Sequence, residues 1–232
     1  MTEKNKTSRI SGLLYLGVVL TGLFSLLYVP NKLIDYENAT LTFQNISKSE
    51  MLFRFGILSG LLCYTFFLFL SLVLYKLLKD VNKNMARLMV LLAIISVPMY
   101  FLNAQNELSI LSLINNPDYL KGFSLEQLQS QVMLHILQYD NGMRLIHVFS
   151  GLWLFPFGFL VYKSNFLPKF FGILLMLGCL GYLINFTGRL LIPEYSDLGI
   201  SSIISLPASI GEIGICLWLL IIGAKEKSTK IT

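Results

Sequence analysis

The residue best placed to do chemistry is Glu212, because it is a carboxylate in the middle of an otherwise apolar run. The run extends from Leu206 to Leu220 and holds no other charged side chain. A lone carboxylate in hydrocarbon is costly, so such a residue faces protein or water and usually has a partner on a neighbouring helix. We therefore expect the other helices to be arranged around Glu212.

Further polar side chains are predicted at a similar depth. Counting about 1.5 Å of helix rise per residue from the basic end of each run places Glu212 about 20 Å into the bilayer and His147 about 24 Å in. Because the hydrocarbon is about 30 Å thick, these groups lie in its outer third. The predicted outward-facing pocket is formed by Glu212, Arg189, Asn185, His147, Arg144, Asn103, Glu107 and Arg54.

Arg189 is the predicted partner of Glu212, because the loop between their two runs is short enough to keep the helices adjacent. A purely structural ion pair between them is the competing interpretation. A competing interpretation is that lipid headgroups are contacted by Arg54, Arg144 and Glu107, since charged residues near the ends of spans often make such contacts.

The sequence contains no recognised catalytic motif. The spacing of its two histidines does not match a zinc protease, and no glycine-rich phosphate loop, serine elbow or dinucleotide fingerprint occurs. A hydrogen bond to a neighbouring helix explains His147 as well as acid–base chemistry does. We expect no metal and no cofactor, and we assign no catalytic residue.

The composition indicates which elements position these residues. Of 232 residues, 55% are hydrophobic and 13% are charged, which is about half the charged fraction of an ordinary soluble domain. Continuous apolar runs of about 20 residues predict membrane-spanning helices rather than barrel strands. The predicted fold is an all-α membrane bundle, residues 1–232 as a single domain, with six spans at about 10–28, 51–74, 88–108, 143–162, 168–191 and 203–224.

One shorter, amphipathic helix is predicted outside the spans. Residues 124–127 have the pattern of a capping box, which begins a helix that runs to about Tyr139. This helix is too short and too polar to cross the bilayer, so we expect it on the outer surface. Asp140-Asn141-Gly142 is expected to end it and to precede the fourth span.

Lysine and arginine predict the orientation. They concentrate at the N-terminus and in alternate connections, which by the positive-inside rule makes both termini cytoplasmic. This distribution also accounts for the net charge of +5, so we expect no nucleic-acid partner. The residues that mark the cytoplasmic side after the first span are Lys76, Lys79, Lys83, Arg87, Lys163, Lys169, Lys225, Lys227 and Lys230.

Five segments carry a resemblance to a known family: 9–15, 50–56, 151–158, 162–169 and 206–212. They resemble a bacterial family of unknown function, filed as domain of unknown function 4386, and the resemblance covers nearly the whole chain. Asn165 stands where many members carry glycine. The resemblance implies a bacterial cytoplasmic-membrane protein with several spans, and it implies no activity, substrate or catalytic residue.

Three functions remain open. The first is a binding or transport-like protein whose pocket holds a small anionic or amphipathic ligand such as a lipid, because the polar layer contains three arginines and two glutamates. Six spans are few for a transporter, and formation of a homo-oligomer would compensate. The second is an enzyme of the outer leaflet with Glu212 or His147 as general acid–base. The third is a structural or regulatory subunit, which a fully packed layer without a cavity beside Glu212 would favour.

Overall fold

The chain is almost entirely helical. A computed structural model describes residues 2–115, 118–195 and 197–224, and no strand occurs among them. Within this described part, six helical segments are long and apolar enough to cross a membrane, which confirms the predicted class and the number of spans. Three of the lysines used to predict the orientation, Lys225, Lys227 and Lys230, lie outside the described residues.

Several of these segments contain more than one helix. The first consists of α1 (Glu3–Leu23), a π-helical turn (Phe24–Tyr28) and α2 (Val29–Leu33), and α3 (Ala39–Lys48) follows it. The second is α4 (Glu50–Leu78), and the third consists of α5 (Lys83–Asn103) and α6 (Gln105–Ile114). A 3-10 turn (Asp118–Leu120) precedes the fourth, which consists of α7 (Leu125–Leu152) and α8 (Leu154–Lys163). The fifth is α9 (Lys169–Leu191), and the sixth consists of α10 (Ile200–Leu217) and a π-helical turn (Trp218–Ile222).

The predicted break between an outer helix and the fourth span is wrong. The capping box over 124–127 is present, with reciprocal hydrogen bonds of 2.8 and 3.2 Å, but α7 then continues through residues 140–142 without interruption. The Asn103 side chain donates a 2.9 Å hydrogen bond to the Tyr139 carbonyl and fills the space that a side chain at Gly142 would need. Gly142 therefore permits a close helix contact here instead of ending a helix.

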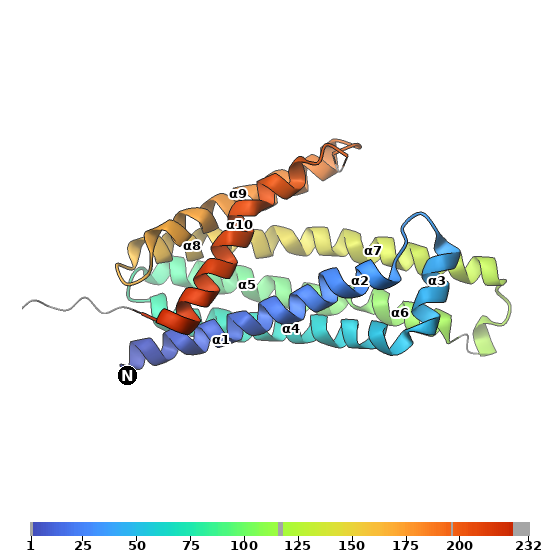
Figure 1. Cartoon of the computed structure of the whole chain (residues 1–232), viewed down its shortest axis with the longest axis horizontal. Helices are drawn as coiled ribbons and strands as arrows, with labels where there is room; N and C mark the ends of the chain where they lie inside the picture. Colours follow the sequence, from blue (N-terminus) through green and yellow to red (C-terminus); the bar gives the residue numbers. More distant parts are fainter. Residues whose placement is uncertain (1, 116–117, 196, 225–232) are drawn as a thin grey trace, which may run out of the picture. The chain divides into compact units, whose positions relative to one another are not determined.

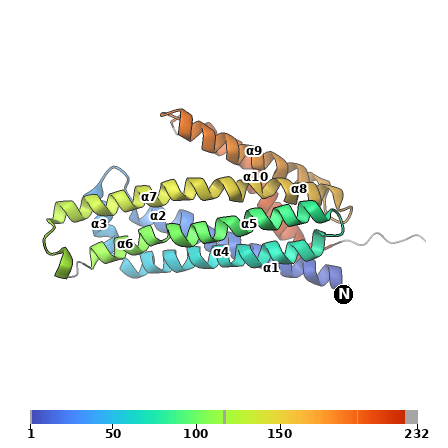
Figure 2. The same ribbon diagram turned by 180° about the vertical axis from the view of Figure 1, so that it is seen from behind.

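A short amphipathic helix does lie outside the spans, but it is α3, where none was predicted. Asn38 caps this helix by accepting a 2.9 Å hydrogen bond from the Leu41 N–H group. Its buried face includes Ile46, and Thr40 donates a 2.9 Å hydrogen bond to Gln129 on α7. Figures 1 and 2 both show α3 beside α6.

The contacts between helices divide the chain into two compact units, each discontinuous in sequence. Unit 1 consists of Met1–Gly17, Phe66–Ser96 and Leu145–Thr232, and unit 2 consists of Val18–Thr65 and Val97–Arg144.

Unit 1 is packed through small residues. Gly158 on α8 faces Gly172 on α9, and Gly178 on α9 faces Ala208 on α10, so closely that an added Cβ at any of these glycines would overlap the other helix. Figure 1 shows α9 running alongside α10. Trp153 is 1% exposed and stacks on a neighbouring phenylalanine, so it packs in the core.

Unit 2 has an aliphatic core and a tight aromatic contact. The tyrosine rings of Tyr64 and Tyr100 stack with their centroids 4.1 Å apart, and an added Cβ at Gly60 would overlap the Tyr100 hydroxyl. Gly60 therefore permits the close approach of the Tyr100 side chain. The core consists of Val29, Leu33, Ile46, Phe53, Ile57, Ile110, Leu111, Val132 and Ile136.

Candidate functional site

Glu212 lies on α10 and has its hydrogen-bond partner on α1. The Tyr15 hydroxyl donates a 3.0 Å hydrogen bond to the Glu212 Oε2 atom. Tyr15 itself is only 1% exposed and packs against Trp153 and Phe157. A neighbouring helix therefore supplies Glu212 with a partner, as predicted, but that partner is a tyrosine.

The predicted pairing of Arg189 with Glu212 is wrong. Arg189 is exposed in the last turn of α9, and its guanidinium donates a 3.1 Å hydrogen bond to Ser201 in the first turn of α10. Glu212 is eleven residues beyond Ser201, which is about 16 Å further along the helix. Its neighbour Gly211 packs against Leu174, near the opposite end of α9. The short loop does keep the two helices adjacent, but the register of the hairpin separates the two charges.

Asn185 closes the hairpin between α9 and α10. Its amide donates hydrogen bonds of 2.9 Å to the Ser205 hydroxyl and 3.2 Å to the Ser201 carbonyl, and it accepts one of 2.8 Å from the Tyr195 hydroxyl. Asn185 is therefore fully occupied by its own hairpin.

His147 is half-buried, with its ring centroid 6.0 Å from that of Tyr182.

Two of the predicted arginines lie at the surface of unit 2. Arg54 forms a 2.6 Å ion pair with Glu50, one turn earlier on α4. Arg144 donates a 3.2 Å hydrogen bond to Asn141 on its own helix. Both side chains are exposed, which favours the interpretation that they are charged residues at the ends of spans.

Glu107 is in a different situation, because part of its carboxyl group is buried without a partner. Within the described residues, its Oε2 atom has no hydrogen bond. Glu107 lies in the first turn of α6 and lines a small cavity of about 30 Å³ inside unit 2. The lining of this cavity is mainly aliphatic and aromatic, and its other polar residues are Ser25, Tyr36, Tyr139 and Asp140.

The polar wall of this cavity is fixed by contacts on α7. The hydroxyls of Tyr139 and Tyr100 are 3.5 Å apart, and Asn103 holds the Tyr139 carbonyl. Tyr36 lies outside the spans, in the connection between α2 and α3. Partial burial and the nearby negative charge of Asp140 raise the pKa of Tyr36 to about 12, so its hydroxyl stays protonated at neutral pH.

The eight predicted residues are divided between the two units, and the structure adds tyrosines that the sequence did not suggest. Tyr15, Tyr36 and Tyr139 were missed, since a tyrosine near an apolar run has no distinctive pattern. No group of three histidines, cysteines, aspartates or glutamates that could hold a metal occurs among the described residues. His147, Asn185, Arg189 and Glu212 belong to unit 1, and Arg54, Asn103, Glu107 and Arg144 belong to unit 2.

Six apolar helices with ionisable residues buried among them define a multi-pass α-helical membrane protein. The chain belongs to the family described as Domain of unknown function (DUF4386), whose model matches residues 10–223, and this confirms the resemblance noted in the sequence.

One relative matches part of the chain. An uncharacterized protein from Archaeoglobus fulgidus is 35% identical over 79 residues, which are 34% of this chain and 44% of that protein. The chain thus spans less than half the length of that relative. No solved structure matches the chain at a significant level.

Proposed function

We propose that this membrane protein binds a small monovalent cation in the cavity of unit 2, with Glu107 as the main ligand. The observation that carries the proposal is the buried Oε2 atom of Glu107, which has no hydrogen-bond partner among the described residues. A carboxylate oxygen in a mostly apolar cavity requires a proton, a donor or a cation to offset its desolvation.

The charge of the cavity lining favours a cation over the anion suggested by the sequence. Two carboxyl groups, those of Glu107 and Asp140, line the cavity, and none of the described lining residues is a lysine, arginine or histidine. Arg54 and Arg144, two of the three arginines on which the expectation of an anion depended, are exposed, and they bond Glu50 and Asn141. An anion in this cavity would meet two acids and no positive side chain among the described lining residues.

The size of the cavity favours a ligand as small as an ion. About 10–15 Å³ is needed to hold one water molecule, so a space of about 30 Å³ suits one or two water-sized particles. A lipid chain or a drug-sized carboxylate needs several hundred Å³. The proposed ligand is therefore Na⁺, K⁺ or a hydrated proton.

The placement of the basic residues supports an outward-facing site. In the positive-inside arrangement both termini are cytoplasmic, and Glu107 lies near the outer end of its span. We place the protein in the cytoplasmic membrane of a bacterium on the same grounds and on the resemblance to its family. The hydrogen bond from Tyr15 gives Glu212 a partner within the protein, which favours a structural role for Glu212 over acid–base chemistry.

Equilibrium binding of radiolabelled sodium to the purified protein tests the proposal, with competition by potassium and by acid. Glu107→Gln removes the charge with almost no change of shape, and Glu126→Gln makes the same change at an exposed position on α7. We expect saturable binding that is lost in Glu107→Gln and kept in Glu126→Gln. Equal binding by the two variants would assign the sodium to another site.

A further inference from the structure

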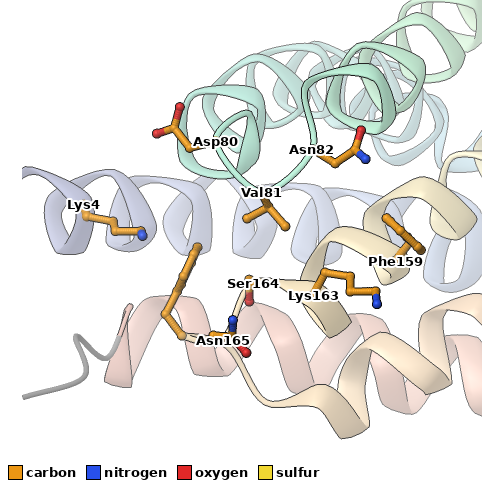
Figure 3. A pocket seen from close by; sticks show the side chains of 9 residues that line it. Lys4, Asp80, Val81, Asn82, Phe159, Lys163, Ser164 and Asn165 are labelled. Atoms are coloured by element: carbon orange, nitrogen blue, oxygen red, sulfur yellow. The ribbon is translucent and has the colours of Figure 1, made fainter.

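Unit 1 has a second, larger recess that the proposed cation site does not involve. It has a volume of about 500 Å³ and lies where three segments meet: the start of α1, the connection between α4 and α5, and the turn between α8 and α9. Figure 3 shows its lining side chains. Two of the membrane-spanning segments begin or end here, at Lys163 and Lys169, so the recess is at the level of lipid headgroups.

The charge of this recess is positive. Lys4 and Lys163 line it, and within the described residues neither forms an ion pair with a carboxylate. The ammonium of Lys4 is 3.8 Å from the centroid of the Phe166 ring, a contact that positions the charge without neutralising it. The one acid in the lining, Asp80, directs its carboxylate away from Lys163 in Figure 3.

Fixed amide groups add hydrogen-bond donors to these charges. The Asn82 Oδ1 atom accepts a 3.0 Å hydrogen bond from Met85 at the start of α5, which leaves its NH₂ group free to donate. The Ser164 hydroxyl donates a 2.8 Å hydrogen bond to the Val161 carbonyl and accepts one of 3.2 Å from the Leu167 N–H group. These two bonds hold the turn after α8 in one conformation. This turn presents Asn165 to the recess.

We propose that this recess binds a phosphate-bearing group, either the headgroup of an anionic phospholipid or a free phosphate compound. Two ammonium groups and two side-chain amides match the charge and the acceptor oxygens of a phosphate. The rings of Phe159 and Phe166 add apolar wall on which the glycerol carbons of a lipid would pack. A pocket of this volume is large enough for a headgroup.

Three variants test the proposal in purified, detergent-solubilised protein. Lys163→Gln removes one of the two charges, and Lys79→Gln is the matched control because Lys79 is exposed near the recess without lining it. Asn165→Gly removes an amide at a residue whose φ of 56° favours glycine, so the turn is kept. The probes are phosphatidylglycerol, phosphatidylcholine and inorganic phosphate, and native mass spectrometry counts the retained lipid.

We expect phosphatidylglycerol to be retained in preference to phosphatidylcholine. Loss of one lysine should weaken this binding about fivefold, since a lysine near an anionic lipid is worth about 1 kcal/mol. Asn165→Gly should weaken it about threefold, as expected for one hydrogen bond, whereas Lys79→Gln should leave it unchanged. Displacement by inorganic phosphate would identify a free phosphate compound as the ligand, and resistance to displacement would identify the lipid.

Two results would overturn this proposal. One is equal retention of the two lipids together with no effect of phosphate. The other is an equal loss in Lys79→Gln and Lys163→Gln, because the attraction would then belong to the whole basic surface and not to the recess.

Discussion

Compared with the wild type, Glu107→Gln should be more stable when no small cation such as Na⁺ is present and less stable when one is. At alkaline pH and in choline chloride, the wild type must keep an unpartnered carboxylate oxygen in an apolar cavity. A buried polar atom without a partner costs about 1–3 kcal/mol, and a charged one costs more. Glutamine keeps the neutral part of this cost and removes the charge, so we expect a gain of about 1–2 kcal/mol.

The bound cation should reverse this order. A ligand at about 100 times its Kd stabilises the folded state by about 2.7 kcal/mol. The wild type would gain this amount and Glu107→Gln would gain nothing, so the wild type should become the more stable protein by about 1 kcal/mol. For a chain of this length, each kcal/mol corresponds to a shift of about 2–4 °C in Tm.

A thiol-reactive fluorescent dye provides the assay, because the buried thiols of Cys63, Cys179 and Cys216 react only when the protein unfolds. Melting curves would be recorded in choline chloride and in sodium chloride at equal ionic strength, for the wild type, Glu107→Gln and Glu126→Gln. The reasoning is refuted if Glu107→Gln responds to sodium as the wild type does. It is also refuted if this variant melts below the wild type in choline.

Three further predictions concern the packing and the tyrosines. Gly60→Ala should lower stability by about 1–3 kcal/mol, because its Cβ would overlap a buried tyrosine hydroxyl. Gly122 has open space around it, so Gly122→Ala should leave the stability nearly unchanged in the same dye assay. Tyr15→Phe should lower stability by about 1–3 kcal/mol, because it removes the hydrogen bond from Tyr15 to the carboxyl group of Glu212. In a double-mutant cycle, most of this loss should disappear when Glu212→Gln is already present. The pKa of Tyr36 is raised to about 12 in the folded protein, so the contribution of Tyr36 to stability is present below pH about 10 and lost as the pH rises through about 12. In an ultraviolet titration, the difference between the wild type and Tyr36→Phe should have its midpoint near pH 12. A midpoint near pH 10 would contradict this prediction.

The spans could be predicted from the sequence because hydropathy depends only on which residues follow one another. A run of about 20 apolar residues has to form a helix in the membrane whatever its neighbours are. The break expected at Asp140-Asn141-Gly142 shows the limit of this reasoning. Those residues favour a turn locally, but Asn103 packs against Gly142 and the helix continues. Contacts between distant segments cannot be obtained from local propensity.

The candidate site could be predicted in part. Glu212 was recognised because a carboxylate within an apolar run is unusual, and Glu107 because the depth counted along its helix placed it in the outer part of the bilayer. Both are at least partly buried. Their surroundings were not predictable, since they depend on helix register. Arg189 lies near the end of α9 and meets Ser201 on α10, whereas Glu212 meets Tyr15 from the first span. A depth counted along each helix contains no information about which face meets which neighbour.

The most direct test of the cation site is infrared difference spectroscopy of the purified protein as sodium is exchanged for choline. A buried carboxyl group changes its stretching frequencies when its proton or its cation is exchanged. The account predicts a carboxyl difference band in the wild type and in Glu126→Gln that is absent from Glu107→Gln. A spectrum without such a band, or one that persists unchanged in Glu107→Gln, would contradict the assignment of this carboxyl group as the cation ligand.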